Sequence, residues 1–355
     1  SVDNETKKVT GYQTMTFSES PSRARKAVKK GSILVSTVRP NLNAVAILEK
    51  DTPNLSIAST GFCILDCKED TDERFVFNYC KSKVFIDDMV SQATGASYPA
   101  VSDKIVRSAL VPAYSYEEQK HIGEVLDKIS DVIEKRRAEL RDLDNLIKAR
   151  FVEMFGERGK VLPLTSYVWF QEGPGVRSVD FTPEGTNLLT GSNINNNELS
   201  FGYKSDRFIS DELANGKYAH FMCDKDDILV VSSAIAPEKF DKKVIIVEED
   251  KKYCLNTGII RFKPNREVMT LGYFREFLKT DYFKHQVMAE MRGIAQMHFG
   301  PSHLKQMTIL LPESMEQQIE FEKFATQVDK SKVAVQKALE ETQTLFDSLM
   351  QEYFG

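Results

Sequence analysis

Residues 117–156 have the sequence EEQKHIGEVLDKISDVIEKRRAELRDLDNLIKARFVEMFG, which carries the clearest structural pattern in the chain. Apolar side chains recur in alternating steps of four and three residues, the pattern of a coiled-coil seam. The seam positions are Ile122, Leu126, Ile129, Ile133, Leu140, Leu143 and Ile147. No Pro or Gly lies between Glu124 and Phe155. The pattern therefore predicts one helix of roughly 50 Å with a narrow apolar face that needs a partner helix.

A partner stretch follows 199 positions later, at residues 316–355. It repeats the seam register, with apolar residues at Phe321, Val328, Val335, Leu339, Phe346 and Leu349. Two aligned positions, Lys332 and Thr342, are polar, and polar seam residues can fix the register of a helix pair at a cost in stability. We predict that the two stretches form an antiparallel coiled coil.

The segments that precede the two helices also repeat. Matching pairs are ILVS at 33–36 with ILVVS at 228–232, STGF at 59–62 with NTGI at 256–259, and LVP at 110–112 with LLP at 310–312. We therefore expect two pseudo-symmetric α/β domains separated by two long helices. The predicted segments are 1–115, 116–156, 157–313 and 314–355. Residues 157–197 have no counterpart in the first domain, which we expect to lack an opening strand and loop.

Local patterns predict individual elements within these domains. β-rich runs bounded by turn residues predict strands at 33–38, 45–48, 62–65, 105–111 and 187–189. Helical spacing of apolar residues predicts one helix over 72–89, and the polar segment 92–99 is expected to be a loop.

Composition narrows the functional classes. The net charge of −5 lies on the helical segments, at −2 for 116–156 and −5 for 313–355, while 1–115 carries +2 and 157–312 is neutral. The domains thus leave room for a basic DNA-binding face. There is no run of 18 apolar residues, so no membrane span is expected. Five cysteines without a CxxC pair are typical of reduced thiols in a cytoplasmic protein.

Motifs of enzymes are missing from the sequence. It contains no phosphate-binding GxGxxG or GxxxxGK[ST], no GxSxG nucleophile elbow and no HExxH zinc motif. We expect no catalytic residue, no bound metal and no cofactor on this chain.

Polar loops instead carry residue types that bind DNA. Arg pairs with guanine, Asn and Gln pair with adenine, and Ser, Thr and Tyr commonly hold phosphates. The candidates are Arg39, Asn41, Asn43, Thr94, Ser97 and Tyr98 in the first domain, and Arg177, Ser192, Asn193, Asn195, Arg292, Gln296 and His298 in the second.

The chain resembles the specificity subunit of type I restriction–modification systems. The resemblance rests on a globular segment followed by a long helix, twice, and on Val111-Pro112 leading to EEQKHIGEVL at 117–126. The second copy, Pro312 to MEQQIEFEKF at 315–324, departs from that pattern at Ile319 and Glu320.

The resemblance implies two target-recognition domains that each read half of a bipartite double-stranded DNA site, with the helix pair setting the spacer. It also implies two modification (methyltransferase) subunits docked on the helices and motor-nuclease restriction subunits. S-adenosylmethionine, Mg and ATP would be bound by those partners.

Two other functions stay open on the sequence. One is a coiled-coil scaffold without sequence-specific DNA binding, and the other is a stand-alone nuclease or methyltransferase, which the missing motifs disfavour. The roles of Phe151, Phe155, Phe346 and Phe354 are also open, since these side chains could dock partner subunits or pack between the helices.

Overall fold

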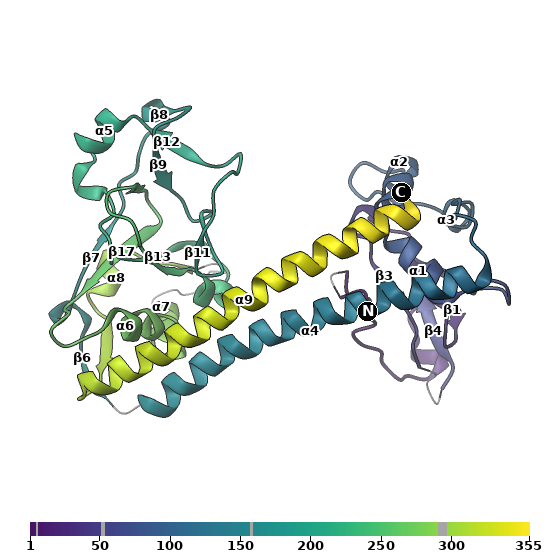
Figure 1. Cartoon of the computed structure of the whole chain (residues 1–355), viewed down its shortest axis with the longest axis horizontal. Helices are drawn as coiled ribbons and strands as arrows, with labels where there is room; N and C mark the ends of the chain where they lie inside the picture. Colours follow the sequence, from purple (N-terminus) through teal and green to yellow (C-terminus); the bar gives the residue numbers. More distant parts are fainter. Residues whose placement is uncertain (5, 51–53, 157–158, 290–296) are drawn as a thin grey trace. The chain divides into compact units, whose positions relative to one another are not determined.

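A computed structural model describes residues 1–4, 6–50, 54–156, 159–289 and 297–355. The chain divides into two compact units. Unit 1 comprises residues 1–140 and 334–355, and unit 2 comprises residues 141–333. Both long helices, α4 (Tyr116–Met154) and α9 (Met315–Phe354), contribute residues to each unit (Figure 1). None of the helices in the described ranges is long and apolar enough to cross a membrane.

Unit 1 is built on a small antiparallel sheet flanked by helices. Its other elements are η1 (Phe17–Glu19), β1 (Ala24–Val28), β2 (Ile33–Ser36), η2 (Pro40–Leu42), β3 (Val45–Ile47), β4 (Ser56–Ser59), β5 (Phe62–Leu65), α1 (Glu73–Lys81), α2 (Lys83–Gln92) and α3 (Asp103–Arg107). The sheet has the order β3-β2-β5, and β1 pairs with β4. The strands predicted at 33–38, 45–48 and 62–65 are confirmed.

The single helix predicted over 72–89 is wrong, because the chain forms two helices there. Ser82 has an extended backbone with ψ of 150°, which ends α1. Its hydroxyl accepts a hydrogen bond from the amide of Phe85 in the first turn of α2. A serine favours this N-cap role over the interior of a helix. The apolar spacing continues across the break, because both helices bury side chains in the same core.

In unit 1 the start of α4 packs near the end of α9. Ile122 and Leu126 belong to the same buried cluster as Phe354. The Phe354 ring lies 5.3 Å from the ring of Phe75 on α1. The end of α9 is therefore held by the globular part of unit 1.

Unit 2 is larger and contains two four-stranded sheets. Its strands are β6 (Lys160–Pro163), β7 (Val168–Glu172), β8 (Phe181–Thr182), β9 (Thr186–Leu189), β10 (Ile194–Asn195), β11 (Glu198–Leu199), β12 (Arg207–Ile209), β13 (Ile228–Val231), β14 (Ser233–Ile235), β15 (Val244–Ile246), β16 (Tyr253–Leu255), β17 (Ile259–Pro264), β18 (Met297–His298) and β19 (Thr308–Leu311). The sheet orders are β15-β13-β17-β7 and β16-β9-β12-β8. The strand expected at 187–189 is confirmed as part of β9.

Helices cover the first of these sheets (Figure 1). The helical elements of unit 2 are η3 (Leu164–Ser166), η4 (Ser178–Asp180), α5 (Asp211–Asn215), η5 (Ala219–Phe221), η6 (Pro237–Lys242), α6 (Leu271–Leu278), α7 (Asp281–Ala289) and α8 (Pro301–Leu304). Aromatic side chains fill the space between α6 and the long helices. Phe321 on α9 lies 5.4 Å from Phe151 on α4 and 5.6 Å from Phe155, which directly follows α4. Phe155 lies 4.9 Å from Tyr273 on α6.

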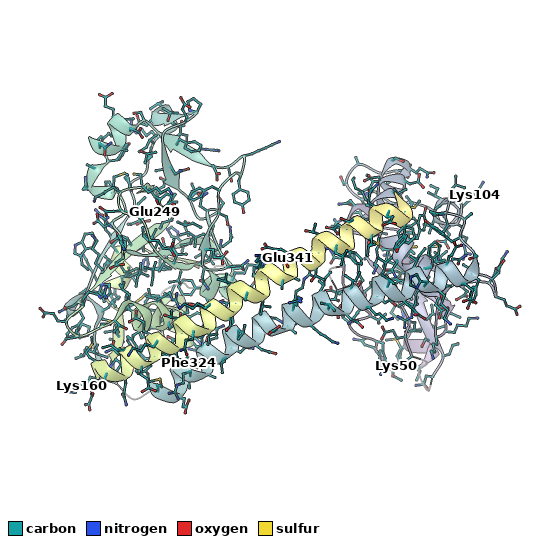
Figure 2. The ribbon with its side chains drawn as sticks, viewed as in Figure 1. Lys50, Lys104, Lys160, Glu249, Phe324 and Glu341 are labelled. Carbon is teal, nitrogen blue, oxygen red and sulfur yellow. The ribbon has the colours of Figure 1, made fainter. Side chains whose placement is uncertain are left out.

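Within unit 2 the two long helices run antiparallel. Lys332 pairs with Asp144 at 2.7 Å, and Arg150 pairs with Glu320 at 2.8 Å, so residue numbers rise on one helix as they fall on the other. Arg150 also lies 5.9 Å from the ring of Phe324, which is labelled on α9 in Figure 2.

The predicted seam positions lie on the covered side of both helices. Ile122, Leu126, Ile133, Ile147, Phe321 and Val328 are buried. Ile129, Leu140, Leu143, Val335, Leu339, Phe346 and Leu349 are half-buried. Phe151, Phe155 and Phe354 are also buried, at 6%, 3% and 3% exposure. Packing within each unit therefore accounts for these three rings, and they offer no surface to a partner.

Each unit contains hydrogen bonds that are repeated at the equivalent positions of the other unit. The Thr37 amide donates to the Gly61 carbonyl at 2.9 Å, and the Ser232 amide donates to the Gly258 carbonyl at 2.8 Å. The amide of Asp72, just before α1, donates to the Gln119 side chain on α4. The amide of Thr270, just before α6, donates to the Gln318 side chain on α9. The sequence repeat thus corresponds to a repeated local structure.

The strand predicted at 105–111 is wrong, whereas its counterpart in unit 2, β19, is a strand. Residues 103–107 form α3, and the following residues form no strand. In unit 2, β19 pairs with β6 over residues 160–163, which belong to the stretch without a counterpart in residues 1–115. No strand pairs with Ala109–Val111 among the described residues, and Leu110 is 89% exposed.

Candidate nucleic-acid interface

Two loops meet at one end of the unit 1 sheet. The first follows β2, and the second spans residues 93–100. The Arg39 amide donates to the Pro99 carbonyl at 2.7 Å, and Val38 forms an isolated bridge with Ala100. We call this end of the sheet, with Arg39, Asn41, Thr94, Ser97 and Tyr98, the unit 1 loop end.

Arg39 is the most distinctive side chain of the unit 1 loop end. Its backbone is left-handed, with φ of 51°, and its side chain is exposed. The guanidinium carbon lies 4.4 Å from the centre of the Tyr98 ring, which is itself 64% exposed. The guanidinium makes no hydrogen bond or ion pair with any described residue, and because the side chain is exposed its donors are accessible to solvent.

The loop that carries Tyr98 depends on a glycine. Gly95 has φ of 101°, and a Cβ added there would lie 2.8 Å from the Tyr98 carbonyl oxygen. The loop closes through reciprocal hydrogen bonds between Thr94 and Ala100, at 3.0 and 2.9 Å. Glycine at position 95 therefore permits the turn that holds Tyr98 beside Arg39.

The remaining unit 1 candidates divide into exposed and buried side chains. Asn41, Thr94 and Ser97 are exposed. Asn43 is only 7% exposed, since its amide donates to the Cys80 carbonyl at 2.8 Å and accepts from Lys7 at 3.0 Å. The expectation that Asn43 faces DNA is therefore contradicted, because its polar atoms already hold the loop to α1.

Unit 2 repeats the framework of this loop end with different side chains. Ala234 occupies the position of Arg39, with φ of 56°, and is exposed. Ser233 pairs with His298 in a β-bridge and lies 3.0 Å from its Nδ1. The predicted candidates Arg292 and Gln296 lie outside the described residues.

The asparagines of the 190–206 region support the loops. Asn193 is 1% exposed and bonds to Thr190, to the Ser200 carbonyl and to Asp206 at 2.8 Å. Asn195 accepts from Lys243 at 2.7 Å. The prediction that Asn193 contacts DNA does not fit its burial. Asn195 is half-buried, and Ser192 and Arg177 are exposed.

One exposed loop was missed by the sequence reasoning. Residues 201–205 place Phe201, Tyr203 and Lys204 at the surface, with Tyr203 48% exposed. Asp206 closes the loop by accepting from the amides of Gly202 and Tyr203 at 2.6 and 3.0 Å. The alternation of aromatic residues with Gly202 and Lys204 was the signal that could have identified it.

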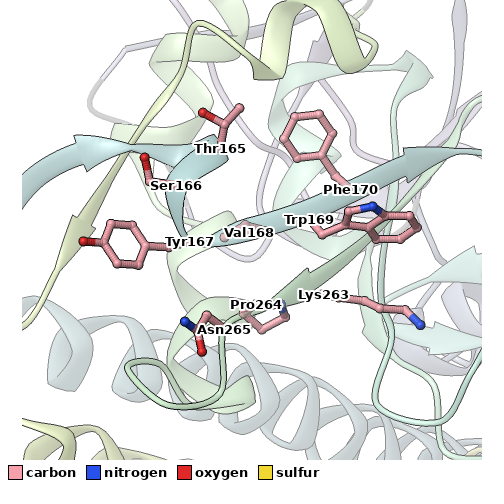
Figure 3. Close-up of a pocket in the computed structure, with 9 residues that line it drawn as sticks. All are labelled: Thr165, Ser166, Tyr167, Val168, Trp169, Phe170, Lys263, Pro264 and Asn265. Atoms are coloured by element: carbon pink, nitrogen blue, oxygen red, sulfur yellow. The ribbon is translucent and has the colours of Figure 1, made fainter.

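A shallow hollow of about 430 Å³ lies along β7 and the end of β17 (Figure 3). It includes Trp169, the only tryptophan, which is 50% exposed. The guanidinium of Arg261 lies 5.2 Å and the ammonium of Lys263 5.8 Å from its ring. Trp169 pairs with Lys263, at the opposite end of β17 from Gly258 and Ser233.

Lys263, which lines this hollow, belongs to a network of charges. Arg261 is 6% exposed and pairs with Asp227 at 3.2 Å, while Lys263 pairs with both Asp224 and Asp227. Hydrogen bonds from Lys251 and Lys263 lower the pKa of Asp224 to about 2. These charges satisfy one another, so the network supports the sheet and leaves little free charge for a ligand.

Comparisons with known proteins agree with this arrangement. No protein-family model matches the chain. Over 265 residues it is 23% identical to the specificity subunit of the type I restriction enzyme MjaVIII from Methanocaldococcus jannaschii, a match that covers 69% of this chain and 61% of that subunit. The chain resembles the specificity subunits of type I restriction enzymes.

Solved structures share the fold. A chain from a study of the assembly and conformational transition of the type I R-M system has a TM-score of 0.57 at 20% identity, covering 99% of this chain and 89% of its own. The S subunit of the type I system from M. genitalium has a TM-score of 0.55 at 15% identity, covering 93% and 84%.

None of the cysteines in the described residues is an activated nucleophile. All five thiols are free, and burial raises the pKa of Cys63, Cys67, Cys80, Cys223 and Cys254. Such thiols stay protonated at neutral pH and react poorly. No group of three or more His, Cys, Asp or Glu in the described ranges is placed to hold a metal ion. For a chain similar to specificity subunits, the exposed loops are the surface of interest.

Proposed function

We propose that this chain is the non-catalytic DNA sequence-recognition subunit of a type I restriction–modification complex. One observation carries the proposal. The two units repeat the same framework of hydrogen bonds, yet the loop ends present different exposed side chains, Arg39 and Tyr98 in unit 1 against Ala234 and His298 in unit 2. A repeated framework with differing loops suits the reading of two different DNA sequences.

Each unit would act as a target-recognition domain for one half of a bipartite double-stranded site. The two domains would be pseudo-symmetric copies. Arg39, Asn41, Ser97 and Tyr98 would supply contacts from unit 1. From unit 2, the contacts would come from Arg177, Ser192 and His298. These contacts stay predictions, as do those of Arg292 and Gln296.

The long helices would form the spacer between the half-sites, as an antiparallel coiled coil along α4 and α9. The salt bridges from Lys332 to Asp144 and from Arg150 to Glu320 support this pairing. The helical segments hold the whole net negative charge of the chain. This charge disfavours contact with DNA phosphates and leaves the helices for protein partners.

The proposed partners are two methyltransferase subunits, docked on the helices and adjacent faces, and motor-nuclease subunits for restriction. S-adenosylmethionine, Mg and ATP would be bound by those subunits. A coiled-coil scaffold without DNA specificity is the alternative, and the following experiment separates the two.

The decisive experiment expresses the chain with its methyltransferase subunits and maps methylated adenines in the host genome. The expected result is methylation at one bipartite sequence with an unspecified spacer, absent when the chain is omitted. Methylation without sequence preference, or no change on omission, would refute the proposal and favour the scaffold.

Spacer function is tested by inserting seven residues into both α4 and α9 at facing positions. Seven residues preserve the seam and lengthen each helix by roughly 10 Å, near three base pairs. The methylated sites should keep both half-sequences and gain about three base pairs of spacer. An unchanged spacer in an active complex would show that the helices do not set it.

A further inference from the structure

The unit 1 loop end contains an arginine that is held in place without its donors being used. The guanidinium of Arg39 stacks on the ring of Tyr98, with 4.4 Å between the guanidinium carbon and the ring centre. Three other arginines of unit 1 use their donors within the unit. Arg74 pairs with Asp127, Arg107 donates to the Ile64 carbonyl at 2.7 Å, and Arg25 donates to the Ser22 carbonyl at 2.8 Å. Arg39 differs from these three because its guanidinium stacks on a ring and makes no hydrogen bond or ion pair with a described residue.

Backbone contacts determine the direction of this side chain. The Arg39 amide is bonded to Pro99, and its carbonyl accepts from the Leu42 amide at 2.9 Å. The left-handed conformation at φ of 51° is uncommon for arginine and is held by these bonds. The ring of Tyr98 restricts the guanidinium further, which reduces the entropy lost when a ligand is bound.

The chemistry of a free, oriented guanidinium points to one base. Its planar fork of N–H donors matches the O6 and N7 acceptors of guanine in the major groove. A phosphate could also accept from arginine, but a phosphate contact carries no sequence information, so the two kinds of contact are told apart by sequence selection.

Unit 2 has the same backbone at this position without the arginine. Ala234 shares the left-handed conformation, at φ of 56°, and its neighbour Ser233 bonds to His298. The equivalent position of unit 2 thus has no side chain that could pair with guanine.

Resting on the proposed function, we propose that Arg39 reads a guanine in the half-site bound by unit 1, with Tyr98 as its positioning residue. The equivalent position of unit 2 makes no such contact. The two half-sites therefore differ at the base pair that faces this position.

The test uses the complete complex with its methyltransferase subunits and selects bound sequences from DNA with both half-sites randomised. The variants are Arg39→Ala, Arg39→Lys, Tyr98→Ala and Tyr98→Phe. Arg39→Ala should fold, because Ala234 adopts the same backbone in unit 2. Lys50→Ala is the charge control, since Lys50 is exposed and follows β3 at the other end of the sheet.

Wild-type protein is expected to require guanine at one position of one half-site. Arg39→Ala and Arg39→Lys should reduce that preference roughly 10- to 100-fold and leave every other position unchanged. Tyr98→Ala should reduce it less, Tyr98→Phe should retain it because the ring remains, and Lys50→Ala should leave the pattern intact.

Two results would overturn the inference. One is an Arg39→Ala complex with an unchanged sequence pattern, and the other is uniformly weaker binding to all sequences, which identifies a phosphate contact. In both cases the wild-type bipartite pattern would still support the proposed function. A wild-type complex without any sequence preference would instead refute the proposed function itself.

Discussion

Gln318→Ala provides a sharp test of how α9 is joined to unit 2. The Gln318 side chain is fully buried, accepts from the Thr270 amide at 2.9 Å and donates to the Val268 carbonyl at 3.1 Å. Alanine removes both hydrogen bonds and leaves the amide of Thr270, which is 5% exposed, without its partner. A lost hydrogen bond costs about 1 kcal/mol and an unsatisfied buried amide about 1–3 kcal/mol, so the expected loss is roughly 2–4 kcal/mol.

The assay is urea denaturation followed by the fluorescence of Trp169. This residue is the only tryptophan and belongs to unit 2, so the signal follows the unit that contains Gln318. With an m-value of about 3 kcal/mol/M, the midpoint should fall by roughly 1 M.

Gln317→Ala is the matched control, since the neighbouring glutamine is exposed. Its loss should stay within about 0.5 kcal/mol. Equal midpoints for the two variants would show that the buried amide of Thr270 does not depend on Gln318.

Three further perturbations follow from the structure. Phe321→Ala should lower the free energy of unfolding by about 3–5 kcal/mol in the same assay, because the ring is fully buried against Phe151 and Phe155. Val333→Ala is the control, since Val333 is 69% exposed and its loss should be near neutral, and a loss below about 1 kcal/mol for Phe321→Ala would contradict the packing. Gly95→Ala should speed amide hydrogen exchange at Thr94 and Ala100, and unchanged exchange would contradict the role of this glycine. Gly175→Ala is the control, because no atom lies within 4 Å of its added Cβ and the exchange of the 93–100 loop should not change. Because the folded-state pKa of Asp224 is lowered from 3.8 to about 2, its carboxylate stabilises unit 2 above about pH 4 and loses this effect as the pH falls toward 2. Asp224→Asn should therefore flatten the dependence of stability on pH in that window, and parallel profiles for the variant and the wild type would contradict a role for this carboxylate.

Short-range patterns were sufficient for much of the fold. The periodicity of 117–156 and of its repeat identified both long helices, because the seam register is a local property of sequence. β-rich runs identified β2, β3 and β5. The strand expected at 105–111 failed because strand formation depends on a neighbouring strand, and none lies there in the described part of unit 1.

The candidate interface shows where local reasoning ends. The sequence predicts Arg39, Asn43 and Asn193 alike as DNA contacts, because all three are polar residues in loops. The fold buries Asn43 and Asn193 among partners that satisfy them and leaves Arg39 exposed. A polar side chain binds a ligand only with donors or acceptors that the protein has not already used.

Local sequence patterns predict the two long helices and a repeated set of short segments, and they show which residue types lie between those segments. No local pattern predicts that Arg39 and Tyr98, 59 positions apart, meet at one end of a sheet, as they do in the fold. The reason is physical, since periodicity is encoded within a few turns of helix. The meeting of two loops instead depends on hydrogen bonds between distant backbone groups, such as that of Arg39 with Pro99.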